Sequence, residues 1–206
     1  MYIETIPAGM LAANCYIVGC KDTKEGVIVD PGGDALNILS KINALGLDIK
    51  YIILTHGHLD HIGAVNDIKK RTQAQICIHE EDRDMLINPA LNFSKQSGRE
   101  IIVGPPDVEL KDGDELWVGN IALKIIHTPG HSLGGICIYT NNSVFTGDTL
   151  FAGSIGRTDF YGGSMEEILY SIKTKLFTLP EETRVYPGHG PSSTIGIEKK
   201  TNPFFV

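Results

Sequence analysis

The sequence lacks the features that define several large classes of protein. No apolar run is long enough to span a bilayer, and no early segment has the basic-then-apolar pattern of a signal peptide. Eighteen Lys and Arg residues against 25 Asp and Glu residues give a net charge of −7, which provides no general basic surface for nucleic acid. We therefore expect a cytoplasmic protein that binds neither membranes nor nucleic acid.

Cysteine is also scarce. The four cysteines are scattered and form no C-x-x-C pair, which argues against a thiol-based metal or redox motif. Cys77 and Cys137 stand within apolar runs, where a thiol behaves as a small buried apolar group. None of the four is predicted to be a nucleophile or a metal ligand.

What the sequence contains instead is an alternation of strands and helices. Runs rich in β-branched and aromatic residues predict strands over 2–6, 14–18, 26–29, 51–54, 75–78, 115–118, 121–126, 135–139, 143–145 and 184–186. Helical spacing of apolar residues predicts helices over 35–45, around 62–68, over 80–87 and from Ser164, where Ser164 and Glu167 form a capping-box pattern. This alternation is typical of a layered α/β fold, and 206 residues fit one domain, 1–206.

One irregular stretch, residues 88–106, interrupts this alternation. Its Asn-Pro, Ser-Gly and Gly-Pro-Pro steps break any regular element. A loop of this length in a compact domain is often functional. Two interpretations stay open, a lid or wall of a substrate site and a mobile surface excursion.

The chemistry of the chain is concentrated directly behind the apolar run 51–54. Three imidazoles and one carboxylate follow it within six residues, on His56, His58, Asp60 and His61. Imidazole and carboxylate are the usual ligands of zinc, iron and manganese. Crowding four such groups together without a metal would cost solvation and gain little. The stretch therefore predicts a metal site at the end of a strand.

Three more potential ligands, His131, Asp148 and His189, also follow apolar strands. Ligands collect beyond the strand ends of α/β sheets, and a glycine beside each group, at 57, 130, 147 and 188, allows a sharp turn there. Five histidines and two carboxylates are too many for one tetrahedral ion but suit two.

These blocks, in this order, resemble the metallo-β-lactamase-fold hydrolases. The segments 147–151 (GDTLF) and 156–160 (GRTDF) are similar to the glyoxalase II-like branch, which includes hydroxyacylglutathione hydrolases and persulfide dioxygenases. The resemblance implies a four-layer αββα sandwich with the site along one edge of the two sheets. It also implies a single domain without the C-terminal helical domain of full-length glyoxalase II.

The resemblance further implies a binuclear site. It assigns one divalent metal to His56, His58 and His131, a second to Asp60, His61 and His189, and a bridging position to Asp148. Zinc is the first expectation, with iron or manganese as alternatives. The catalytic residues would be His58, through the first metal, and Asp60, which could aim a metal-bound bridging hydroxide at a carbonyl carbon.

Four further polar residues need separate interpretation. Asp30 and Thr55 are either hydrogen-bonding partners of the ligand histidines or turn caps. His127, four residues before His131, is expected to be an outer partner or a structural histidine rather than a ligand. His79 is expected to be a surface histidine at a strand end.

The function that follows from the resemblance is hydrolysis of a small-molecule acyl thioester. Arg157 is a candidate for binding a substrate carboxylate, but the favoured interpretation is a pairing of Arg157 with Asp159 or with the backbone that shapes the loop. One alternative function is a persulfide dioxygenase with a single iron on His56, His131 and Asp148. Another is a non-catalytic metal-binding module. The sequence leaves the oligomeric state open, a homo-oligomer included.

Overall fold

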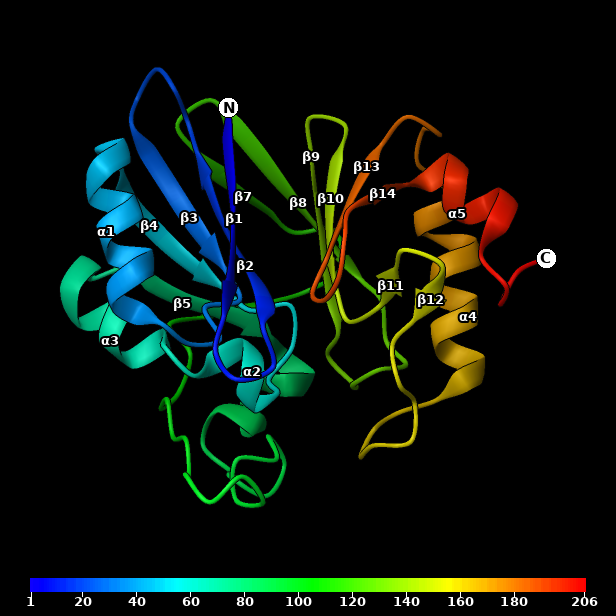
Figure 1. Cartoon of the computed structure of the whole chain (residues 1–206), viewed down its shortest axis with the longest axis horizontal. Coiled ribbons are helices and arrows are strands. Elements are labelled where there is room, and N and C mark those ends of the chain that lie inside the picture. Colours follow the sequence, from blue (N-terminus) through cyan, green and yellow to red (C-terminus); the bar gives the residue numbers. More distant parts are fainter.

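Two mixed β-sheets pack face to face in the computed structural model, which describes residues 1–206 (Figure 1). In spatial order, the first sheet contains β1 (Tyr2–Ala8), β2 (Ala13–Gly19), β3 (Glu25–Val29), β4 (Asp48–Ile53), β5 (Gln75–His79) and β6 (Val108–Leu110). The second contains β14 (Ser193–Thr194), β13 (Arg184–Pro187), β10 (Ser143–Gly147), β9 (Ile136–Thr140), β8 (Ile121–His127) and β7 (Glu115–Val118). A small ribbon of β11 (Leu150–Phe151) and β12 (Ser154–Ile155) follows β10 along the chain.

Helices cover the outer faces of the two sheets and one of their edges (Figure 1). They are α1 (Ala35–Leu45), α2 (Leu59–Ile62), α3 (Val65–Thr72), α4 (Met165–Thr174) and α5 (Ile195–Thr201), with the 3₁₀ helices η1 (Glu80–Leu86) and η2 (Leu176–Thr178). Figure 1 shows α1 and α3 outside the first sheet and α4 and α5 outside the second. The predicted four-layer αββα sandwich is therefore confirmed. None of the helices combines the length and the apolar character that a membrane span requires.

Three apolar clusters fill the spaces between the four layers. Successive residues of β4 point to opposite faces of the first sheet, as the pleat requires. Ile52 packs with Ile38 of α1 in the outer cluster, whereas Ile53 packs in the cluster between the sheets that also contains Phe145. A third cluster joins Val144 of the second sheet to Ile168 of α4. Fully burying one such side chain contributes about 1.5–3 kcal/mol, so these clusters hold the layers together.

Some elements differ from the sequence-based expectations. The single helix expected around 62–68 is two helices, α2 and α3, separated at Gly63. The backbone of Gly63 packs so closely on Gly32 that an added Cβ would lie 2.3 Å from the Gly32 carbonyl oxygen. The short strands β6, β11, β12 and β14 and the helix α5 were not predicted, because two or three residues give no readable periodicity. Helix α5 does begin with a cap, since the Thr194 side chain accepts the Ile197 N–H.

The strand directions bring distant segments of the chain to one edge of the molecule. Strands β3, β4 and β5 are parallel, so their C-terminal ends lie together. In the second sheet β10 is parallel to β13, and β8 and β10 are both antiparallel to β9. The two sheets are joined at this edge, where Ile136 N–H donates to the Thr55 carbonyl at 2.9 Å. Figure 1 shows α2 at this edge, below the strands.

Candidate metal centre

The four ligand-bearing segments predicted from the sequence meet at this edge. In each of three overlapping groups, the potential ligand atoms lie within 4.8 Å of one another. The groups are His56, His58 and His131; His56, His61 and Asp148; and Asp60, His61 and His189. The structure thus brings all seven predicted ligands together, as a binuclear site requires.

Asp148 lies between two of these groups, the first trio (His56, His58 and His131) and the second trio (Asp60, His61 and His189). Its Oδ1 atom is 3.4 Å from His61 Nε2, and its Oδ2 atom is 3.7 Å from both His131 Nε2 and His189 Nε2. One carboxylate oxygen therefore faces the second trio, and the other faces both. This is the arrangement that a bridging carboxylate needs.

Several atoms of the cluster are buried without a hydrogen-bond partner. They are His56 Nε2, His58 Nε2, His61 Nε2 and Asp148 Oδ1. A buried polar atom without a partner costs about 1–3 kcal/mol, so four of them in one place would destabilise the fold unless another group satisfied them. A divalent cation fits this donor set, since imidazole nitrogens and carboxylate oxygens are its usual ligands.

The protonation of the histidines differs between the two trios. Burial, reinforced by the neighbouring His61, holds the pKa of His56 well below its usual value, and burial lowers the pKa of His58 to about 3. Burial also acts to lower the pKa of His61, but the carboxylates of Asp148 and Asp30 outweigh it and raise that pKa to about 10. His56 and His58 are therefore neutral and ready for a metal at neutral pH, whereas His61 must first release a proton.

Asp30 orients the ligand segment from behind. It is the first residue after β3, is 1% exposed, and turns the chain with a φ of 50°. Its carboxylate accepts the Thr55 N–H at 2.7 Å and the Thr55 hydroxyl at 2.5 Å, and its Oδ2 lies 3.0 Å from His61 Nδ1. The Thr55 hydroxyl in turn lies 3.1 Å from His56 Nδ1. These contacts leave Nε2 of both rings pointing into the cluster, so the outer-partner interpretation of Asp30 and Thr55 is confirmed.

Asp30→Asn is expected to weaken metal binding about 10- to 100-fold, the usual cost of losing an outer partner. The amide would present a donor where the carboxylate now accepts, so the His61 ring would lose its fixed orientation. Metal affinity is measured by competition with a coloured chelator. The control is Asp48→Asn, which changes an exposed carboxylate paired with Lys50 and should leave the affinity unchanged. Equal affinities in the two variants would contradict the role of Asp30.

The turn that carries His189 is held by β2. The Asn14 side chain donates to the carbonyls of Pro187 and Gly190, at 3.0 and 2.9 Å, and the Tyr16 hydroxyl donates to Pro187 at 2.6 Å. A Cβ at Gly188 would lie 2.2 Å from Asp148 Oδ1, so this position requires glycine for space. The glycine predicted beside this ligand is therefore needed for close approach, not for a left-handed turn.

A hollow of about 560 Å³ opens over the cluster. His58, Asp60, His131, Asp148 and His189 form its floor. Its walls are mainly apolar and come from Leu11, Leu59, Phe93, Phe151, Ile155, Arg157 and Phe160. A small molecule in this hollow would contact the ligand residues directly.

Two aromatic side chains cover one end of this hollow. Phe93 and Phe160 have ring centroids 4.7 Å apart, and their centroids lie 5.0 and 5.5 Å from that of His58. Phe93 belongs to the irregular segment 88–106 and was not identified from the sequence. The segment is anchored here, because buried Asn92 donates to the carbonyls of Met85 and Ile101 at 2.7 and 3.0 Å. This geometry favours the wall interpretation of 88–106.

Comparison with known proteins identifies the family. The family model described as the metallo-beta-lactamase superfamily matches residues 8–189, which include every predicted ligand. The chain belongs to the metallo-β-lactamase superfamily.

Two relatives from this superfamily match over nearly the whole of both chains. Probable metallo-hydrolase YqgX of Bacillus subtilis is 39% identical, with 97% of this chain and 95% of the relative covered. Hydroxyacylglutathione hydrolase GloC of Haemophilus influenzae is 36% identical, with coverage of 99% and 98%. The protein is thus similar to metallo-hydrolases of about its own length.

Solved structures of superfamily members share the whole fold. The BLEG-1 B3 metallo-beta-lactamase is 41% identical with a TM-score of 0.95, and all of both chains is covered. TTHA1623 in a di-iron-bound form is 35% identical with a TM-score of 0.86, covering 99% of this chain and 100% of that one. ETHE1 from Myxococcus xanthus is 30% identical with a TM-score of 0.83, covering 98% and 84%. The similar proteins therefore have names that indicate more than one reaction, including a β-lactamase and a hydroxyacylglutathione hydrolase.

Within this superfamily site, Arg157 makes the loop-shaping pair. Its guanidinium donates to both carboxylate oxygens of Asp159, at 2.9 and 2.7 Å, and stacks 4.2 Å from the Phe160 ring centroid. The Arg157 carbonyl lies 2.8 Å from His131 Nδ1 and accepts a hydrogen bond from it in the tautomer that carries the hydrogen on Nδ1. The Arg157 side chain also lines the hollow, so substrate binding by Arg157 stays a prediction.

The two remaining histidines lie outside the ligand cluster. His79 was expected at the surface, and that prediction is wrong, since His79 is 4% exposed. Its ring stacks on His127 with centroids 4.0 Å apart, which the sequence could not reveal because 48 residues separate the two. His127 Nε2 lies 2.8 Å from the Leu133 carbonyl, which agrees with a structural role.

Asp82 is a buried positioning residue that the sequence analysis missed. Its carboxylate accepts the Gly57 N–H at 3.3 Å, the Ser132 hydroxyl at 2.7 Å and the Gly134 N–H at 2.7 Å. It therefore ties the segment of His58 to the segment of His131. Burial raises its pKa despite these hydrogen bonds. Its place in an acidic stretch at residues 80–82 gave no signal that it points inward.

Proposed function

We propose that the protein is a metal-dependent hydrolase of acyl thioesters with a binuclear metal site. The observation that carries this proposal is the position of Asp148 between two ligand trios, each with at least one buried nitrogen that lacks a partner. Two divalent ions bound there, zinc, iron or manganese, would supply a water that ionises near neutral pH and a Lewis acid for the thioester carbonyl.

Asp60 suits the task of orienting the attacking water. Burial acts to raise its pKa, but the hydrogen bond from His189 and the charge of His61 outweigh it and lower that pKa below its ordinary value. Asp60 is therefore an ionised carboxylate at neutral pH, and it lies in the floor of the hollow. An acceptor in that position can take a hydrogen bond from water and fix its direction toward the substrate carbon.

The apolar walls suit an uncharged acyl group. Phe93 and Phe160 place two apolar rings at one end of the hollow, and apolar surroundings strengthen electrostatic interactions at its floor. A thioester needs little further help from the protein, because its thiolate leaves without prior protonation. The absence of a serine or cysteine nucleophile in the floor is consistent with direct attack by water.

The named relatives support a thioester as substrate. The Haemophilus hydroxyacylglutathione hydrolase is matched over 98% of its length, so its name belongs to a chain of similar extent. Full-length glyoxalase II enzymes have a glycine-lysine-aromatic segment at the place where this chain has Gly156-Arg157-Thr158-Asp159-Phe160. We therefore infer a thiol carrier that is not held by that segment in the glyoxalase II manner.

The test combines metal content with three assays on one preparation. Protein purified without oxygen and without added metal is analysed for metal and assayed for thioester hydrolysis with a thiol reagent, for hydrolysis of a chromogenic β-lactam, and for oxygen uptake with glutathione persulfide. Two ions per chain with thioester turnover are expected. Two ions without thioester turnover, or β-lactam turnover alone, would refute the thioester proposal.

A second candidate, a persulfide dioxygenase, is favoured by one motif. The segment 156–160 is similar to that of the persulfide dioxygenases. A single iron on His56, His131 and Asp148 would leave positions open for oxygen and sulfur. One iron per chain with oxygen uptake, and no thioester turnover, would support this candidate instead.

A further inference from the structure

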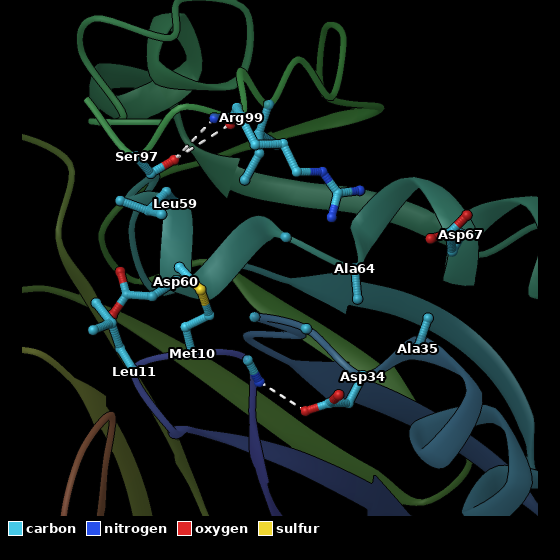
Figure 2. A pocket seen from close by; sticks show the side chains of 15 residues that line it. Met10, Leu11, Asp34, Ala35, Leu59, Asp60, Ala64, Asp67, Ser97 and Arg99 are labelled. Atoms are coloured by element: carbon cyan, nitrogen blue, oxygen red, sulfur yellow. Dashed lines mark hydrogen bonds between the residues drawn. The ribbon is translucent and has the colours of Figure 1, made fainter. Parts of the chain in front are cut away.

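A second hollow, of about 630 Å³, lies beside the candidate metal centre (Figure 2). It shares Leu11, Leu59 and Asp60 with the hollow over the metal ligands, so the two hollows lie side by side with Asp60 on the border between them. Its walls come from four segments: the β1–β2 turn, the loop before α1, the α2–α3 region and residues 97–101. A substrate whose reacting carbonyl lies at Asp60 can therefore extend into both hollows.

The second hollow is also lined by charged groups, in addition to those of the metal centre. Its lining contains the carboxylates of Asp34, Asp60 and Asp67 and the guanidinium of Arg99. Asp34 accepts the Gly9 N–H at 2.9 Å, and Asp60 belongs to the metal centre. The two remaining charged groups are the Asp67 carboxylate and the Arg99 guanidinium. Neither of them makes a hydrogen bond or an ion pair within the protein.

Arg99 lies across the hollow from the β1–β2 turn. The Ser97 hydroxyl donates to the Ser94 carbonyl at 2.8 Å and lies 3.5 Å from the Arg99 N–H, which it accepts as a long hydrogen bond. In Figure 2 the Arg99 side chain reaches over the hollow toward Ala64, with Asp67 beyond on the same side. One free cation and one free anion thus border the same space, where a ligand with both charges would find a partner for each.

Exposed apolar side chains stand opposite these charges. Met10 and Leu11, at the β1–β2 turn, are 89% and 59% exposed. Figure 2 shows both beside the hollow, close to Asp60. They offer an apolar surface for the aliphatic stem that separates a sulfur atom from a charged end.

We propose that this hollow binds the thiol carrier of the substrate, and that the carrier ends in a carboxylate and an ammonium group, as an amino acid or small peptide does. The carboxylate binds Arg99, the ammonium group binds Asp67, and the acyl arm enters the apolar hollow beneath Phe93. This proposal rests on the proposed thioesterase function, because it places the acyl half of a thioester in one hollow and the thiol half in the other. A volume of 630 Å³ is within the range of small-molecule sites.

The test uses the metal-loaded protein and three acetyl thioesters that differ in carrier charge. N-acetylcysteamine has no charge, N-acetylcysteine has one carboxylate, and glutathione has carboxylates and an ammonium group. We expect kcat/KM to rise in that order. Arg99→Gln should lower the preference for the N-acetylcysteine thioester over the N-acetylcysteamine thioester, measured as the ratio of their kcat/KM values, about five- to tenfold. The change should come from a higher KM for the N-acetylcysteine thioester. Asp67→Asn should lower the glutathione to N-acetylcysteine ratio about fivefold.

Lys95→Gln is the matched control, since it removes a charge from the same segment at a residue outside the hollow. It should leave both ratios unchanged. If Arg99→Gln lowers kcat/KM equally for all three thioesters, or leaves the ratios unchanged, the carrier site is refuted.

Failure of the proposed function gives a different result, which is no turnover of any thioester. In that case the binding of S-methylglutathione, a thioether that cannot be hydrolysed, is measured by calorimetry on the metal-loaded protein. Weaker binding to Arg99→Gln than to Lys95→Gln would support the carrier site without the hydrolase. Equal binding, or none, would refute it.

Discussion

His58→Ala should abolish thioester hydrolysis, with kcat/KM falling about 10³-fold or more, the scale of losing a group that stabilises the transition state. The first metal would keep His56, His131 and the bridging Asp148, and losing one of its ligands would weaken its binding. The metal content should fall by one ion per chain. Because burial already keeps His58 neutral at pH 7, the loss should not depend on pH between 6 and 8.

The control for His58→Ala is His127→Ala. His127 is the last residue of β8, which ends at the same edge of the molecule. Its ring contacts the Leu133 carbonyl and stacks on His79, and it belongs to neither trio. Its variant should retain both ions and most of the turnover, with a lower melting temperature from the lost stacking. Unchanged turnover and unchanged metal content in His58→Ala would refute the ligand assignment.

The cluster of candidate ligands could be predicted from the sequence because its signal is local. Each candidate lies in a segment that follows an apolar strand, and strand ends of α/β sheets lie together whatever the details of the loops. His56, His58 and His61 stand so close in the chain that one turn brings them together. The sandwich itself followed from resemblance, since periodicity alone supported only an α/β fold with more than one sheet.

The walls of the site could not be predicted, because tertiary contacts determine them. Phe93 adopts a φ of 64°, which a phenylalanine rarely does, and it is held there through its buried neighbour Asn92. Asp82 points inward because Ser132 and Gly134, fifty residues later, offer it donors. No period or motif in the sequence carries information of this kind.

The two candidate chemistries make opposite demands on Asp60. A binuclear hydrolase needs its carboxylate, which lies 3.1 Å from His189 Nε2 and 3.6 Å from His61 Nε2 in the second trio. A mononuclear dioxygenase holds iron on His56, His131 and Asp148 and does not use Asp60 as a ligand. The same substitution therefore affects the two chemistries differently.

Asp60→Asn should lower kcat for thioester hydrolysis about 10²- to 10³-fold and remove the second ion, while the first trio keeps its metal. The amide keeps the size of the side chain but loses the charge that attracts the metal and accepts a hydrogen bond from water. Metal analysis and steady-state kinetics are carried out beside Asp22→Asn, an exposed carboxylate that contacts only Asn120. If Asp60→Asn retains one iron per chain and full oxygen uptake with glutathione persulfide, the second trio is dispensable. Such a result would assign the site to sulfur oxidation.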